Sequence, residues 1–376
     1  MLKYIFRFIP LLLSTLFTFF SMIPAGFEKL EADISGQVER ITQLEQSYNS
    51  GDVDSVDELS FFDGDLEKEI KNGLKFNDLR YIATHNSYQT ASTEQLSKIF
   101  RNLSDLTFGL VSEKTADFVS PTITDQLNNG IYSLELDIET FDRNGEVSFT
   151  CMHSPCFEMG TSCYDFSLTL KEIAMWSDNN PNHLPITIII EPKETFLPMK
   201  SMKFFNVEYA KEFDKTLKAG LGDKLFTPSD MLGDYENFAQ LRADDGWCEV
   251  KDMLGKVLVL LQECNVTEKY ISIDESLKTQ AMFPMLSADG ADRDCASFIL
   301  ANKPEELMEI REELLDEKKL VVRTRSDKFT QISEERRKSA FESGAQIIST
   351  DYPVMGNAER EDYFVSFGGI KTISIR

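Results

Sequence analysis

The chain has 376 residues, of which 42% are hydrophobic, and a formal net charge of −24 at pH 7. This length and composition predict one large domain or two ordinary ones with a sizeable core. The acidic charge argues against nucleic acid as a partner, because phosphate backbones are bound by clustered Lys and Arg side chains. An anionic ligand would need a metal ion or a local basic patch.

The N-terminus has the pattern of an export signal. Lys3 and Arg7 precede an uncharged run of 18 residues from Phe8 to Ala25. We expect a signal peptide over residues 1–25, cut after Ala25. An uncleaved membrane anchor is the alternative, because the run is barely long enough to span a bilayer. Both forms predict that the rest of the chain is secreted or otherwise extracytosolic.

Residues 26–75 differ in composition from the rest of the chain and form an acidic N-terminal extension. Val38, Ile41 and Leu44 have the spacing of one helix face, and the acidic segment 51–69 follows. The pattern predicts a short helix and a solvated linker or cap.

Six cysteines, an even number in an exported chain, predict disulfides whose pairing the sequence leaves open. Three of them lie near a histidine in the pattern Cys151-x-His153-x2-Cys156-x6-Cys163. A zinc site is one interpretation of this cluster. Disulfides are favoured, because thiols in an oxidising compartment pair more often than they hold metal.

From about Lys75 onward, short strands rich in β-branched residues alternate with helical stretches such as 167–180 and 303–319. This alternation predicts a parallel sheet with helical crossovers. The expected strands are 80–84, 132–138, 147–152, 185–191, 256–262, 297–301, 321–325 and 345–350. Eight such strands predict a single α/β domain, a (β/α)8 TIM-like barrel over residues 76–376. A doubly wound open sheet is the alternative, weakened because no Gly-rich loop follows the first strand.

Polar side chains lie at the carboxyl ends of the first two predicted strands, where barrels carry their chemistry. The first strand ends at His85 and Asn86. In the second, Glu135 and Asp137 alternate with leucines, so both carboxylates are expected to point into the barrel mouth. Burying two charges without a partner is costly, and a ligand is therefore expected between them.

The third and fourth predicted strands add His153 and Glu191 to the same rim. Three carboxylates so close together repel one another, and a hard cation such as Ca²⁺ or Mg²⁺ would relieve this. The two rim histidines could flank a reacting phosphate as acid and electrostatic donor. The remaining histidine, His183, lies in a loop before the fourth strand and is expected on the surface.

The motifs "THNSY", "LELDI", the histidine after them and "IIIEPK" resemble the catalytic half of the calcium-dependent phosphatidylinositol-specific phospholipases C. With "VRTRSD" and "STDYP" in later strands, the chain is most similar to the small exported enzymes of this family, over roughly residues 76 to 356. The resemblance implies that Ca²⁺ is held by Asn86, Glu135, Asp137 and Glu191. It also implies that His85 binds the phosphate and that His153 is the general acid.

The reaction implied by the resemblance is Ca²⁺-dependent cleavage of phosphatidylinositol, or a glycosylated form, to diacylglycerol and a cyclic inositol phosphate. Glu135 or Glu191 would be the base. The predicted fifth strand lacks the lysine pair that grips extra ring phosphates in the eukaryotic signalling enzymes, which favours an unphosphorylated lipid. We expect a monomer that contacts a membrane surface transiently. Phe196, Leu197 and Met199, after the fourth strand, are candidates for dipping into a leaflet, although an ordinary loop is the alternative.

Five further residues at strand ends are candidates for substrate contacts: Lys193, Arg323, Arg325, Asp351 and Tyr352. Lys193 shares a strand face with Glu191, and the two arginines share an inward face because they are two residues apart. The last two end the eighth predicted strand, where a polar group and an aromatic face could meet an inositol ring.

Two other functions remain open from the sequence. A glycerophosphodiester phosphodiesterase or sphingomyelinase-D-like enzyme uses a similar barrel, metal and histidine pair. Its first strand typically ends in His-Arg-Gly, whereas this chain has His85-Asn86-Ser87. A non-catalytic exported barrel protein would need the acidic rim only to hold structural calcium.

Overall fold

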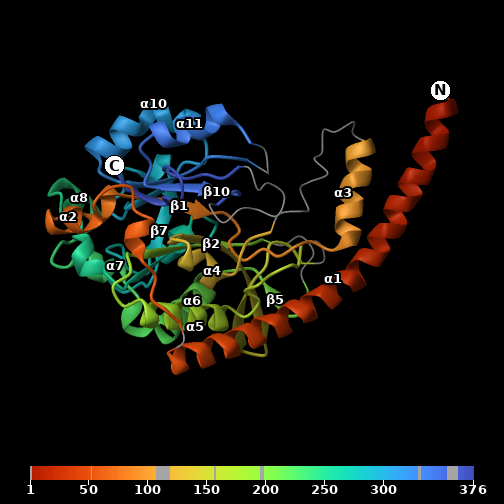
Figure 1. Cartoon of the computed structure of the whole chain (residues 1–376), viewed down its shortest axis with the longest axis horizontal. Coiled ribbons are helices and arrows are strands. Elements are labelled where there is room, and N and C mark those ends of the chain that lie inside the picture. Colours follow the sequence, from red (N-terminus) through yellow and green to blue (C-terminus); the bar gives the residue numbers. More distant parts are fainter. Residues whose placement is uncertain are drawn as a thin grey trace.

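A curled sheet of parallel strands forms the centre of the structure (Figure 1). The computed structural model describes residues 2–51, 53–106, 119–155, 158–194, 199–328, 332–353 and 363–376. In chain order the parallel strands are β1 (Leu79–Thr84), β2 (Ser133–Arg143), β4 (Ile186–Pro192), β6 (Val257–Gln262), β7 (Phe283–Ser287), β8 (Phe298–Leu300), β9 (Val321–Arg325) and β10 (Ile347–Thr350). Their order around the sheet is β1-β10-β9-β8-β7-β6-β4-β2, which confirms the predicted α/β barrel.

Helices follow most of the strands, as a barrel with right-handed crossovers requires. They are α1 (Leu2–Ser50), α2 (Leu66–Lys71), α3 (Glu94–Leu106), α4 (Ile123–Asn128), α5 (Phe166–Asn179), α6 (Val207–Leu221), α7 (Pro228–Leu232), α8 (Phe238–Ala243), α9 (Thr267–Ile271), α10 (Pro304–Arg311) and α11 (Glu334–Glu342). The helices predicted at 167–180 and 303–319 are confirmed as α5 and as α10 with the π-helical turn Glu312–Glu317.

The two faces of the strands contribute side chains to two different layers of the hydrophobic core. Leu134, Leu136 and Ile138 of β2 pack in the outer layer with side chains of α5 and α6. Ile189 and Leu260 belong to the inner layer, inside the barrel. The leucines of β2 therefore face the helices as predicted, which turns Glu135 and Asp137 towards the barrel interior.

The predicted set of barrel strands differs from the structure in two places. β3 (Glu146–Cys151), predicted as the third parallel strand, returns antiparallel along β2 in a hairpin. The parallel strand β7 is not among the predicted strands, because it contains Pro284 and proline weakens a strand pattern. Two short strands complete the sheet: β5 (Met202–Lys203) pairs with β2, and β11 (Ile373–Ile375) pairs with β1.

The barrel has a seam between β1 and β2, since no strand ladder joins them in the described ranges. The loop after β1 bridges this seam. Ser87 N donates to Glu135 O at 2.9 Å, and Glu135 N donates to Ser87 Oγ at 2.8 Å. Gln126 Nε2 of α4 donates to Ser87 O at 2.7 Å. The segment that carries His85 is therefore attached directly to β2.

The helix predicted within residues 26–75 is part of the longer α1, which spans 49 residues and runs through the predicted signal peptide. The C-terminal part of α1 follows one side of the barrel, whereas its N-terminal part extends away from it beside α3 (Figure 1). Of the three residues predicted to share a face, Ile41 is buried and Val38 is 51% exposed. In the part of the chain that the structure covers, no helix is long and apolar enough to cross a membrane.

The acidic segment, predicted as a solvated linker or cap, also contributes buried residues. Phe62 is buried in the outer core and forms an isolated bridge with Ile373 of β11. Asp65 caps α2 by accepting a hydrogen bond from Lys68 N. Residues 26–75 thus pack on the barrel at several points.

The predicted disulfides are absent among the five described cysteines, Cys151, Cys163, Cys248, Cys264 and Cys295, which are free thiols. Cys156 lies outside the described residues. Cys151 and Cys163 are buried in the apolar outer core, and burial raises the pKa of Cys163 to about 11. No metal-binding group of the described residues includes a cysteine, so the structure gives no support to a zinc site.

The surface position expected for His183 is wrong. Its ring lies near the rings of Trp176 and Tyr132, with centroids 5.2 and 6.4 Å away. Nδ1 is 2.7 Å from Leu184 O, which can only accept, so Nδ1 donates and Nε2 accepts from Ser177 Oγ at 2.8 Å. Both ring nitrogens of the neutral imidazole are therefore satisfied.

We expect His183→Gln to remove part of the pH dependence of stability. Burial lowers the pKa of His183 from 6.5 to about 4 in the folded chain. Because the folded pKa is the lower one, the contribution to stability is present above about pH 6.5 and is lost as the pH falls towards 4.

Urea unfolding near neutral pH and at about pH 4.5 tests this. Between these pH values, the free energy of unfolding of the wild type should fall by about 2–3 kcal/mol more than that of His183→Gln. Equal falls in both proteins would contradict a buried neutral imidazole.

Candidate active site and metal centre

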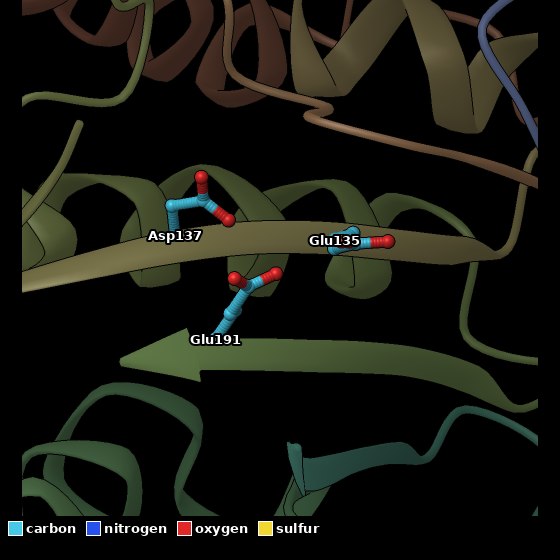
Figure 2. A group of neighbouring side chains, drawn as sticks. All are labelled: Glu135, Asp137 and Glu191. Atoms are coloured by element: carbon cyan, nitrogen blue, oxygen red, sulfur yellow. The ribbon is translucent and has the colours of Figure 1, made fainter. Parts of the chain in front are cut away.

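Three carboxylates meet where β2 runs beside the carboxyl end of β4. Each of Glu135, Asp137 and Glu191 offers one oxygen, and these oxygens lie within 4.8 Å of one another. Figure 2 shows the carboxylates of Asp137 and Glu191 facing each other across the two strands, with Glu135 farther back along β2. The parallel register places Asp137 directly opposite Glu191, which explains why these two lie closest in the view.

Two basic side chains partly neutralise this acidic cluster. Lys193 Nζ is 2.9 Å from Asp137 Oδ2 and 2.6 Å from Glu191 Oε1. Arg323, which is buried, reaches Glu135 Oε2 from β9. Burial raises the pKa of Asp137 to about 6, although the charge of Lys193 opposes this. Burial also acts to raise the pKa of Glu191, but Lys193 outweighs it and the pKa is lowered.

The donor set fits a hard cation such as Ca²⁺. Asp137 Oδ2 accepts from Tyr88 Oη at 2.8 Å, whereas Asp137 Oδ1 is buried and has no hydrogen-bond partner among the described residues. A buried, unpartnered carboxylate oxygen is costly unless a ligand binds it. Carboxylate oxygens from three residues are the ligands that Ca²⁺ prefers. The cluster can therefore bind a metal ion.

Asn86, expected as a fourth ligand, lies in the loop that crosses the seam. Its φ of 46° is in the left-handed region, which asparagine tolerates better than most residues. Its Nδ2 donates to Gln89 Oε1 at 3.2 Å, and its backbone oxygen accepts from Ser120 Oγ. These bonds hold the loop, and the next residue, Ser87, is bonded to Glu135.

His85 faces the acidic cluster and is oriented by a carboxylate on its other side. Its Nε2 lies 3.9 Å from Glu135 Oε1, and its Nδ1 lies 2.9 Å from Asp351 Oδ1. Arg325 donates to both oxygens of Asp351 at 3.1 Å. Asp327 accepts from Asp351 N at 3.0 Å. A carboxylate on Nδ1 fixes the ring and directs Nε2 towards the site.

His153 is delivered by the β2–β3 hairpin rather than by a barrel strand. β3 runs back to the rim and ends opposite Ile138, and His153 follows two residues later. The imidazole contacts the carboxylate of Glu158. Burial acts to lower the pKa of His153, but the hydrogen bond and charge of Glu158 outweigh it, and the pKa is raised.

The residues predicted to contact substrate all reach the rim, but their described partners are protein groups. Lys193 and Arg323 bind the acidic cluster. Asp351 holds His85, and Arg325 in turn binds Asp351. Tyr352 is buried against Tyr363, with ring centroids 5.3 Å apart. A role in binding substrate stays a prediction for each of them.

Four residues that support site side chains are not predicted from the sequence. Tyr88 donates to Asp137, Glu158 contacts His153, Asn302 accepts from Arg323, and Asp327 accepts from Asp351 N. Tyr88 and Asp327 lie inside the motifs "THNSY" and "VRTRSD". Their closeness in sequence to the predicted site residues is therefore a signal that could have indicated their supporting role. Glu158 and Asn302 lie in loops, where no strand alternation indicates the direction of a side chain.

The apolar loop after β4 is described only in part. Phe196 and Leu197 lie outside the described residues. Phe204 is 62% exposed and Phe205 is buried. An aromatic side chain is thus exposed in the 194–205 segment, although it is not one of those predicted.

The comparisons with known proteins show the family and support the fold. Residues 140–375 match the model of the family "Phosphoinositide phospholipase C, Ca2+-dependent". The chain belongs to this family. The match confirms the resemblance seen in the strand-end motifs. His153, Glu191 and the two rim arginines lie inside the matched residues, whereas β1 with His85 and the first part of β2 precede them.

Relatives of this family member share sequence or fold to different extents. A "PI-PLC X domain-containing protein" of Arabidopsis thaliana is 30% identical over 128 residues, which are 32% of this chain and 25% of that protein. A calcium-dependent phosphoinositol-specific phospholipase C from a Pseudomonas species is 17% identical, with a TM-score of 0.55 over 85% of this chain and 98% of that one. A Ca²⁺-dependent phosphatidylinositol-specific phospholipase C from Streptomyces antibioticus is 19% identical, with a TM-score of 0.55 over 81% and 99%. These two structures support the fold.

We expect Arg323→Met to destabilise the protein in the presence of chelator by about 3–5 kcal/mol, because it leaves Glu135 buried without its partner. Adding Glu135→Gln should recover part of this loss. Urea unfolding of both single variants and the double variant gives the coupling energy. Additive losses would contradict a direct ion pair.

We expect Ca²⁺ to raise the melting temperature of the wild type, because a ligand that binds only the folded state stabilises it. Asp137→Asn and Glu191→Gln should abolish this shift. Glu146→Gln, an exposed carboxylate on β3, is the matched control and should retain it. A full shift in Asp137→Asn would exclude the cluster as the metal centre.

Proposed function

We propose that this protein cleaves phosphatidylinositol, or a glycosylated form of it, to diacylglycerol and a cyclic inositol phosphate in a Ca²⁺-dependent reaction outside the cytosol. The observation that carries the proposal is the meeting of three carboxylates within 4.8 Å, with His85 Nε2 3.9 Å from one of them. Membership of the calcium-dependent family supports the same reaction class.

A bound Ca²⁺ would be held by Asn86, Glu135, Asp137 and Glu191, would stabilise charge on the phosphate and would lower the pKa of the inositol 2-hydroxyl. Glu135 or Glu191 accepts the proton of that hydroxyl as its oxygen attacks phosphorus. The new bond joins the 2-oxygen to phosphorus, and the bond from phosphorus to the diacylglycerol oxygen breaks.

The two histidines have different tasks in this proposal. His85 donates a hydrogen bond from Nε2 to a phosphate oxygen, while Asp351 holds Nδ1. His153 protonates the departing diacylglycerol oxygen, and Glu158, which raises the pKa of His153, favours the protonated form that a general acid needs. The substrate requires transient contact with a membrane surface, for which the exposed Phe204 near the rim is a candidate.

The test of the reaction is headgroup release from phosphatidylinositol vesicles in excess Ca²⁺ and then in excess chelator, with the product identified by phosphorus NMR. Calcium-dependent formation of a cyclic inositol phosphate is expected. Release from choline or glycerol phosphodiesters, with none from inositol lipids, would refute the proposal.

We expect His153→Ala to lower kcat by about 10²–10⁴-fold, because a general acid contributes that much. The melting-temperature shift with Ca²⁺ should be retained. Glu158→Gln should move the alkaline limb of the kcat–pH profile to lower pH, because the pKa of His153 loses its support. An unchanged kcat in His153→Ala would remove it from the mechanism.

A further inference from the structure

The C-terminal part of α1 is bonded to the backbone of one loop segment, residues 161–165. Its side chains contact four backbone groups at helical spacing. These contacts are Asp33 Oδ2 with Thr161 N (2.9 Å), Arg40 Nη2 with Ser162 O (2.7 Å), Gln37 Oε1 with Asp165 N (2.8 Å) and Gln37 Nε2 with Asp165 O (3.0 Å). The segment joins α5 to the loop that carries His153, which we call the His153 loop. The contacts of α1 therefore fix the end of that loop.

The same segment also touches the loop that begins at His85. Ser162 N donates to Tyr88 O at 2.8 Å, and Gln89 forms an isolated antiparallel bridge with Thr161. Tyr88 in turn donates to Asp137. The His85 and His153 loops thus run side by side where α1 meets them.

Asp33 binds both loops with a single oxygen. Its Oδ2 accepts from Thr161 N at 2.9 Å and from Thr90 Oγ1 at 3.0 Å. Lys29, one turn earlier on α1, pairs with the carboxylate at 2.9 Å. The Asp33 side chain is 13% exposed. Its contacts are therefore shielded from most competing water.

Apolar contacts hold α1 against the same loop. Leu30 packs with Met152 and Met159, which flank His153 and Glu158 in the sequence. A Cβ at Gly26 would lie 2.7 Å from the end of the Met159 side chain, so the helix approaches the loop closely. The helix face that carries Asp33 is consequently fixed in place.

We propose that Asp33 is a positioning residue that holds the His85 loop and the His153 loop at a fixed separation across the active site. This inference rests on the proposed function, which gives the two histidines their roles. A group misplaced by about 1 Å can cost about 10² in rate, so a bond that fixes both loops acts on kcat. Asp33 precedes residues 140–375 of the family match and follows the predicted cut after Ala25.

The experiment compares Asp33→Ala, Asp33→Asn and the matched control Glu31→Ala, an exposed carboxylate on the same helix. With phosphatidylinositol vesicles and saturating Ca²⁺, Asp33→Ala should lower kcat by about 10- to 100-fold with little change in KM. Asp33→Asn keeps an acceptor oxygen and should recover much of the rate. Glu31→Ala should stay within about twofold of the wild type.

A second pair of variants removes only one of the two bonds. Thr90→Val loses the hydroxyl that donates to Asp33, whereas Thr90→Ser retains it. We expect kcat to fall several-fold in the first and to stay near the wild-type value in the second. Equal activity in both would overturn the inference.

Hydrogen–deuterium exchange separates this inference from the proposed function. In Asp33→Ala, amide exchange should rise in residues 85–90 and 158–163 and stay unchanged in β8. Unchanged exchange in both loops would overturn the inference even if the wild type is active. Absence of headgroup release by the wild type would overturn the proposed function, and the exchange data would still decide whether Asp33 holds the loops.

Discussion

The structure depends on keeping three carboxylates, two of them buried and one half-buried, close together although their charges repel. Two basic side chains, which come from different sides of the barrel interior, reduce this repulsion. Lys193 lies directly after β4, two residues beyond Glu191, and Arg323 reaches Glu135 from β9. Because β9, β10 and β1 lie on one side of the seam and β2 on the other, the pair of Arg323 and Glu135 spans the seam. The acidic centre therefore also joins the two ends of the sheet.

Each histidine of the site is held by a separate carboxylate, and the two carboxylates come from different parts of the fold. His85 is held by Asp351 at the end of β10, and Arg325 and Asp327 hold Asp351 in turn. His153 is held by Glu158 within a single loop, and that loop is supported from outside the barrel by α1. The support of His85 is thus part of the barrel wall. The support of His153 depends on an added helix.

Strand alternation allowed much of the site to be predicted from sequence. It placed Glu135 and Asp137 inside because Leu134 and Leu136 need an apolar layer, and the structure has this arrangement. It failed where a side chain is fixed by a loop or a helix from elsewhere. His183 was expected on the surface because the residues around it in the sequence are polar. This local pattern does not indicate that its ring packs against Trp176. The contacts of Glu158 and Asp33 depend on chain segments whose meeting no local pattern records.

The pairing of β1 determines when this strand can join the sheet during synthesis. Tyr81 pairs with Ile347 of β10 on one side and with Ile373 of β11 on the other. A chain that is synthesised or exported from its N-terminus presents β1 long before either partner. Until then both edges of β1 are open, and exposed strand edges invite wrong pairing. The strand that begins the active centre is thus among the last to be enclosed, and a nascent chain that stops short of β10 lacks a complete site.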